Sequence, residues 1–229
     1  ATISSDCTYS PGTYLLDSLT VQSGVTVNID NRPDRCDTTH QGYGCENLSY
    51  TDHSPRIMVK GDVEIDGTVN ADYEGFRNAT AVANRGGPGA GTSREVSGGG
   101  GYGGAGGNSD SYDDGGSSYG DPEEPRRLGS AGAYDINGVK GGDGGGSLWM
   151  MAQGQMRIDG TVTADGENSP GGAGGGAGGS IQLHAGEYAG TGTVSAEGGS
   201  NSNRGGGGGG GRISLIRESG SAQPFFTTI

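Results

Sequence analysis

The chain has 229 residues, of which 53 are glycine, and hydrophobic residues make up only 29%. With 14 basic and 27 acidic residues, the formal net charge is −13. The glycines form contiguous runs with only eight prolines, which excludes collagen. No apolar stretch approaches the roughly 18 residues of a membrane-spanning helix, and protein surfaces that bind nucleic acid carry positive charge, unlike this acidic chain. We therefore expect neither membrane insertion nor a nucleic-acid partner.

Short strands are the first predicted elements. Residues 14–21 and 25–30 alternate apolar and polar side chains and are rich in β-branched residues, with a Ser23-Gly24 turn between them. Further strands are predicted at residues 57–59, 63–70, 148–152, 156–163, 181–185, 191–196 and 213–217. No window shows the 3.6-residue period of a helix, so the sequence predicts an all-β protein with almost no helix.

Residues 31–54 interrupt this pattern and are predicted to form a polar surface insertion. Cys36 and Cys45 lie within it, and we expect them to form a disulfide that closes the loop. Cys7 would then be a free thiol or pair between chains, and a Cys7–Cys36 bond is the alternative.

Several features indicate an exported protein. The chain opens Ala-Thr-Ile-Ser-Ser, with neither the charged nor the apolar region of a signal peptide, as expected of a mature, processed product. Asn47 and Asn78 each begin an Asn-x-Ser/Thr triplet and are candidate glycosylation sites. The expected location is extracellular or on the cell surface.

An internal repeat gives the strongest prediction of architecture. The pattern Gly-Thr-Val-x-Ala-acidic recurs in IDGTVNAD from Ile65, IDGTVTAD from Ile158 and GTGTVSAE from Gly190. Apolar strands that begin at Ser147 and Ser180 precede the last two copies, 33 residues apart. A repeat of about 32 residues with two short strands and no helix is typical of a β-solenoid. We expect residues 1–229 to form one such domain.

Glycine tracts follow the strands in phase with the repeat, at Gly98–Gly107, Gly171–Gly179 and Gly205–Gly211. Tracts at the same phase of successive repeats can lie side by side as three-residue-per-turn helices of the polyproline II type, joined by backbone hydrogen bonds. The alternative is that they are flexible linkers, as glycine-rich segments often are.

Taken together, VEIDGTVNAD, SGGGGYGGAGG, GGDGGGSLWMMAQGQMRIDGTVTADG and GGAGGGAGGSIQLHAGEYAGTGTVSAEGG resemble the glycine-rich β-helical modules of large bacterial and other surface proteins. The resemblance extends from about Gly12 to Ile216 and implies a surface or adhesion protein without catalytic residues. The insertion at 31–54 and the ending QPFFTTI depart from it. Through the glycine tracts alone, the chain also resembles phage tail-tip adhesins and polyglycine antifreeze proteins.

Residues that could carry chemistry are few. The histidines His40, His53 and His184 lack the spacing of a zinc site, and no nucleophile elbow is present, so we expect no enzyme. No resident cofactor is expected, although calcium is a possible ligand because carboxylates cluster in a glycine-rich loop. The calcium candidates are Asp110, Asp113, Asp114, Asp121, Glu123 and Glu124.

Tyrosines accompany the same loop, at positions 102, 112, 119 and 134. They can cover the glycine tracts as lids, which we favour, or stack on glycans.

The apolar C-terminal tail, residues 220–229, suggests self-assembly. Pro224, Phe225, Phe226 and Ile229 are predicted to pack against a neighbouring subunit, with an intramolecular cap as the alternative. The function predicted first is an extracellular structural subunit that polymerises head to tail. The rival prediction is an adhesin that recognises a glycan or a surface receptor.

Overall fold

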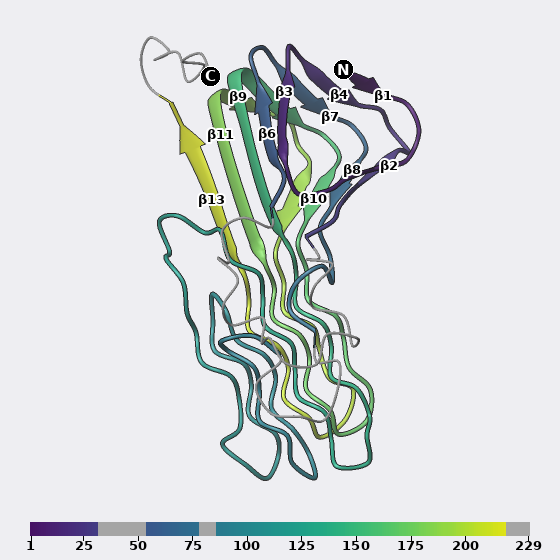
Figure 1. Ribbon diagram of the computed structural model, residues 1–229, viewed down its shortest axis with the longest axis vertical. Coiled ribbons are helices and arrows are strands. Elements are labelled where there is room, and N and C mark those ends of the chain that lie inside the picture. The colour runs from purple at the N-terminus through teal and green to yellow at the C-terminus, as the bar shows by residue number, and fades with distance from the viewer. Residues whose placement is uncertain (32–53, 78–85, 219–229) are drawn as a thin grey trace.

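The computed structural model describes residues 1–31, 54–77 and 86–218, and within these ranges it contains strands and no helix. This confirms the predicted all-β class. The strands form an 8-stranded and a 5-stranded sheet, and every pairing is parallel (Figure 1). The strands are β1 (Thr2–Ile3), β2 (Cys7–Tyr9), β3 (Thr13–Leu16), β4 (Leu19–Val21), β5 (Thr26–Ile29), β6 (Arg56–Val59), β7 (Val63–Ile65), β8 (Thr68–Asn70), β9 (Ser147–Ile158), β10 (Thr161–Thr163), β11 (Ser180–Ala189), β12 (Thr193–Ser195) and β13 (Arg212–Arg217).

Strands from successive segments of the chain stack into three columns. The first column is β3, β6, the first half of β9, the first half of β11, and β13. The second is β1, β4, β7 and the second halves of β9 and β11. The third is β2, β5, β8, β10 and β12, which form the 5-stranded sheet. Each column therefore holds five strands or strand halves.

The strand register confirms the alignment of the internal repeat. Val162 pairs with Val69 on one side and with Val194 on the other, as the repeated Gly-Thr-Val motif predicts. Likewise, Ser180 pairs with both Ser147 and Arg212. Two further strands, β5 and β2, extend the third column, although the repeat alignment did not include them.

Several strand boundaries differ from those predicted. Residues 14–21 and 63–70 each contain two strands, because the chain turns between columns within them. At the second of these turns, a Cβ on Gly67 would overlap the carbonyl oxygens of Gln22 and Val25, so only glycine fits there. Conversely, β9 runs without a break through residues 147–158, where two strands were predicted. The short strands β1 and β2 were not predicted.

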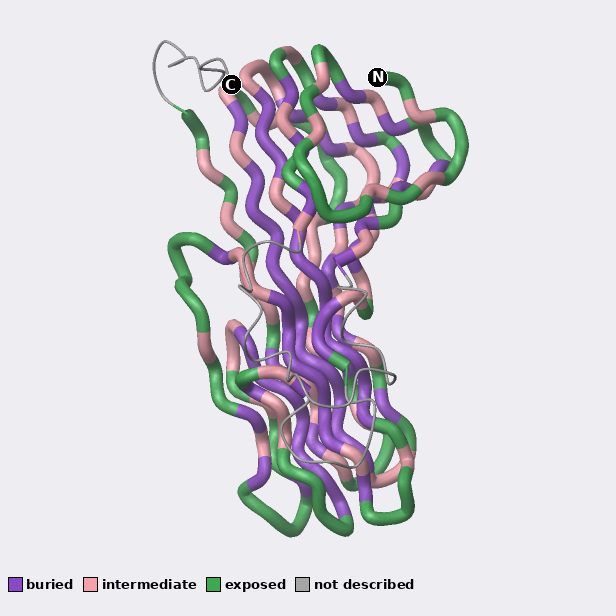
Figure 2. The backbone as a smooth tube through the Cα atoms, viewed as in Figure 1, coloured by how far each residue is buried: buried purple, intermediate pink, exposed green. Residues whose placement is uncertain are grey.

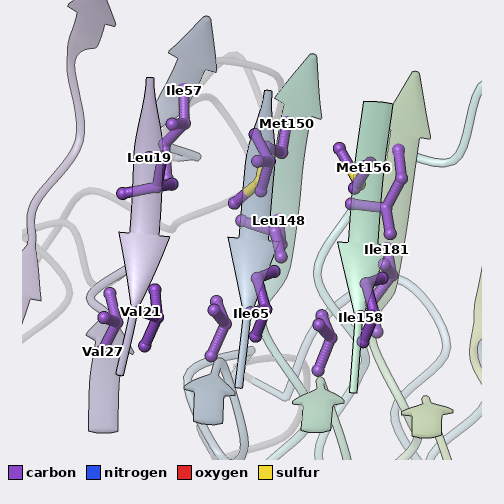
Figure 3. Close-up of a cluster of buried hydrophobic side chains, with 14 of the residues drawn as sticks. Leu19, Val21, Val27, Ile57, Ile65, Leu148, Met150, Met156, Ile158 and Ile181 are labelled. Atoms are coloured by element: carbon purple, nitrogen blue, oxygen red, sulfur yellow. The ribbon is translucent and has the colours of Figure 1, made fainter. Parts of the chain in front are cut away.

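The hydrophobic core lies between the two sheets and is built from inward-facing positions of all three columns (Figure 3). In the second column, Val21, Ile65 and Ile158 pair in register, and all three are buried. Burying each side chain of this size contributes about 1.5–3 kcal/mol. The core also includes Leu19, Val27, Ile57, Val59, Leu148, Met150, Met156, Ile181 and Leu183.

The other half of the molecule contains no strands among its described residues, yet its centre is buried (Figures 1 and 2). Here the glycine tracts run side by side and are joined by backbone hydrogen bonds. The amide of Gly100 donates to Gly175, that of Gly175 to Gly206, and that of Gly209 back to Gly100, at 2.8–2.9 Å. Main-chain hydrogen bonds thus satisfy a buried region that has almost no side chains.

Tyrosine side chains fill the junction between the glycine layer and the strands. Tyr102 is fully buried, and its hydroxyl lies 2.6 Å from the hydroxyl of Ser180. Its ring centroid lies 5.1 Å from that of Tyr119. Tyr102 therefore packs inside the molecule, Tyr119 and Tyr134 are half-buried, and Tyr112 is exposed.

One boundary of the predicted insertion needs correction. Asn31 is not a surface residue: it is fully buried, and its side chain exchanges two hydrogen bonds with the backbone of Ser147, at 2.8 and 2.9 Å. Cys7 is half-buried and forms no disulfide with any described residue. Cys36, Cys45, Asn47, Asn78 and the tail residues Pro224, Phe225, Phe226 and Ile229 lie outside the described residues.

Candidate functional site

The two ends of the columns form the candidate functional surface. At one end, β13 and β12 pair with only one described strand each. At the other end the same holds for β1, β2 and β3. Unpaired strand edges present rows of amides and carbonyls that can pair with another chain.

The hydrogen-bond direction along β13 shows which groups remain available. Arg212 donates its amide to Gly179, and Glu218 donates to Ala185, both at 2.9 Å. Because amides alternate in direction along a strand, those of Ile213, Leu215 and Arg217 point to the open edge. This edge can therefore accept another parallel strand in the register used throughout the sheet.

Two apolar side chains are uncovered on the same strand. Ile213 and Leu215 are 44% and 53% exposed, whereas their register partners on β11, Ile181 and Leu183, are fully buried. They occupy core positions of the first column, but no described residue covers them. Because each side chain is already about half buried, burial of the remaining exposed half of both would add about 1.5–3 kcal/mol to an association before ordering costs.

Polar side chains connect one copy of the repeat to the next. Asp165 accepts hydrogen bonds from the amide of Glu197 and the hydroxyl of Ser195, at 2.6 and 2.7 Å. Asp72 accepts from the amide of Asp165 at 2.7 Å, so the three acidic positions form a ladder. Asp72 and Asp165 therefore each satisfy a backbone amide in the next copy of the repeat.

We expect Asp165→Ala to destabilise the protein by about 1–2 kcal/mol, because it leaves the part-buried partners of Asp165 without an acceptor. Urea denaturation measures the change. Asp17→Ala removes an almost fully exposed carboxylate and is the matched control, with an expected effect below about 0.5 kcal/mol. Equal losses for the two variants would show that the ladder contributes nothing specific.

The calcium candidates do not converge. Among the described residues, no group of three acidic, histidine or cysteine side chains has the geometry of a metal site. Asp114 accepts from the amide and hydroxyl of Ser109, and Asp113 accepts from Asn108. Three of the other four candidates have different partners: Asp110 pairs with Arg204, Asp121 accepts from the amide of Glu123, and Glu124 pairs with Arg126. Calcium binding stays a prediction.

A buried charge cluster lies at the side of the glycine layer. Asp143 is only 6% exposed and pairs with Lys140 at 2.8 Å and with Arg77 at 3.2 Å. Burial raises the pKa of Asp143 above its ordinary value, and the two cations oppose that rise. Glu167 accepts from the amide of Asp143 at 3.0 Å. The cluster joins Lys140 and Asp143 to Arg77 and Glu167, which lie far from them in the sequence.

The raised pKa of Asp143 predicts a specific pH dependence. A carboxyl group whose pKa is higher in the folded state binds its proton more tightly there, so its contribution to stability falls as the pH rises from about 4 through the folded pKa. We expect Asp143→Asn to abolish this contribution. Between pH 4 and pH 7, urea denaturation should therefore show that the parent protein loses more stability, or gains less, than the variant. An unchanged difference would mean that Asp143 does not titrate in this window.

No family model, curated protein or solved structure matches this chain. None of the described residues belongs to a helix that could cross a membrane.

Proposed function

We propose that this protein is an extracellular structural subunit, a glycine-rich β-solenoid that polymerises head to tail into a filament on the cell surface. One observation carries the proposal: the three columns end in complementary ways. At the β13 end, the first column extends one strand beyond the other two. At the opposite end, the second and third columns begin one strand before the first.

A second copy can continue all three columns with one translation. Its β3 would pair with the open edge of β13, its β1 with the second half of β11, and its β2 with β12. Each column holds five strands, as in the 5-stranded sheet of the third column. With about 4.8 Å between strands, the copies would repeat every ~24 Å. A head-to-tail interface of this kind does not close, so it produces a filament.

The glycine tracts show a regular spacing of the positions at which a side chain would have room. In the tract 205–211, a Cβ on Gly207 would have 3.6 Å of clearance, and one on Gly210 would meet nothing. A Cβ on Gly206, Gly208 or Gly209 would overlap a carbonyl oxygen of a neighbouring segment. An open position at every third residue fits a helix with three residues per turn. We therefore propose that the tracts are polyglycine II helices packed side by side.

Further parts of the proposal concern location and partners. The protein acts outside the cell, its principal partner is a second copy of itself, and it has neither a cofactor nor catalytic activity. The Cys36–Cys45 disulfide, glycosylation at Asn47 and Asn78, and packing of Pro224–Ile229 against a neighbour belong to the same proposal. They fit an exported protein that must stay soluble until it assembles.

Electron microscopy of the purified protein tests the proposal. We expect unbranched filaments one subunit wide, which lengthen as the protein concentration rises. Particles that stay monomeric at all concentrations would overturn the filament function and favour the adhesin prediction.

A further inference from the structure

A small hollow lies on the outer face of the first column, away from both open ends. Ser54, Arg56, Arg126, Ser147 and Trp149 line it. Arg56 on β6 and Trp149 on β9 are register partners, so the sheet holds their side chains next to each other on one face. Arg126 reaches the hollow from a segment outside the sheets.

The lining carries positive charge in a strongly acidic protein. Two of its five residues are arginines and none is acidic, although the whole chain has a net charge of −13. Arg126 is held in place: its Nε donates to the buried Gln182 at 3.4 Å, and its guanidinium lies 3.5 Å from Glu124. Arg56 is exposed and pairs with no described carboxylate. Within the described residues, an anion can therefore approach Arg56 without displacing a carboxylate partner.

The size of the hollow limits what can enter. Its volume is about 10 Å³, which corresponds to about one water-sized group. One oxygen of a carboxylate fits such a space, and a carboxylate matches the planar fork of a guanidinium. Trp149 provides the adjoining surface: it is half-buried, with its ring centroid 5.6 Å from that of His184. The negative face of an aromatic ring attracts the C–H groups of a flat ligand.

We propose that this surface binds a carboxylate-bearing saccharide, with the carboxylate of a uronate between Arg56 and Arg126 and its sugar ring on Trp149. A peptide that binds by adding a strand needs a sheet edge, whereas this hollow lies on a sheet face. The inference does not depend on polymerisation, because the hollow belongs to a single subunit.

The chain contains one tryptophan, so its fluorescence reports on this site alone. Titration with trigalacturonic acid should change the Trp149 emission in a saturable way, while galactotriose, a neutral trisaccharide, should bind at least tenfold more weakly. Arg56→Gln and Arg126→Gln should each weaken uronate binding about tenfold or more. Arg157→Gln removes the same charge from an exposed ion pair with Asp159 elsewhere on β9 and should leave binding unchanged.

Three results would overturn the inference. They are the absence of a saturable response, equal affinity for the neutral trisaccharide, and binding of tri-glutamate as tight as that of the uronate. Circular dichroism of each variant must match the parent spectrum, so that lost binding cannot be attributed to misfolding.

Discussion

Gly208→Ala should destabilise the protein by about 1–3 kcal/mol or more, whereas Gly207→Ala should change its stability by less than about 0.5 kcal/mol. The two positions are adjacent in one tract and receive the same methyl group. At Gly208 that methyl would overlap the carbonyl oxygen of Gly176, while at Gly207 its nearest neighbour is 3.6 Å away. The backbone of Gly176 is itself hydrogen-bonded to Glu167, so it cannot move aside freely.

Urea denaturation of both variants measures the difference, and Gly175 offers a second test within the layer. Gly175→Val places a larger side chain against Gly199 and Gly208, so its loss of stability should exceed that of Gly208→Ala. If all three variants unfold at the midpoint of the parent protein, the tracts are loosely packed and the proposed polyglycine II layer is wrong.

The double variant Ile213→Lys/Leu215→Lys should fold as a monomer and fail to form filaments. Both side chains are about half exposed in a single subunit, so the substitutions remove little internal packing. In a filament, however, they would bury two ammonium groups at the new core position, where unpaired charge is strongly unfavourable. Charged residues on an edge strand also oppose the pairing of further strands.

Ile136→Lys is the matched control, because Ile136 is 70% exposed and lies outside the strands. Sedimentation velocity over a range of concentrations should show polymers for the parent and the control, and monomers for the double variant. Polymers of normal length from the double variant would mean that the β13 edge is not the contact.

The repeat was predictable because the strand copies keep the same residues at the same spacing. Gly-Thr-Val aligned the third column, and the strands that start at Ser147 and Ser180 aligned the first. The turns between columns were harder to place. The chain changes direction at Asp66-Gly67, between β7 and β8. Apolar and polar side chains continue to alternate across this turn, so the sequence alone predicts a single strand over residues 63–70.

The glycine layer and the outer hollow could not be derived from sequence patterns. A run of glycines has no side chains that distinguish inward from outward positions, so the difference between Gly207 and Gly208 depends on segments far away in the chain. Similarly, Arg56, Arg126 and Trp149 are separated by many residues and meet only through sheet pairing and a distant loop. The sequence does indicate that β13 belongs to the first column, because Ile213 and Leu215 align with Ile181 and Leu183, with which they pair in the sheet.

The axial repeat of the proposed filament tests the central claim most directly, and X-ray fibre diffraction or helical reconstruction from electron micrographs measures it. Five strands per column and about 4.8 Å per strand predict an axial repeat of ~24 Å per subunit, together with a strong reflection at about 4.8 Å along the fibre axis. A filament whose subunits are related by a two-fold axis, or whose strands run along the fibre axis, would contradict head-to-tail continuation of the columns.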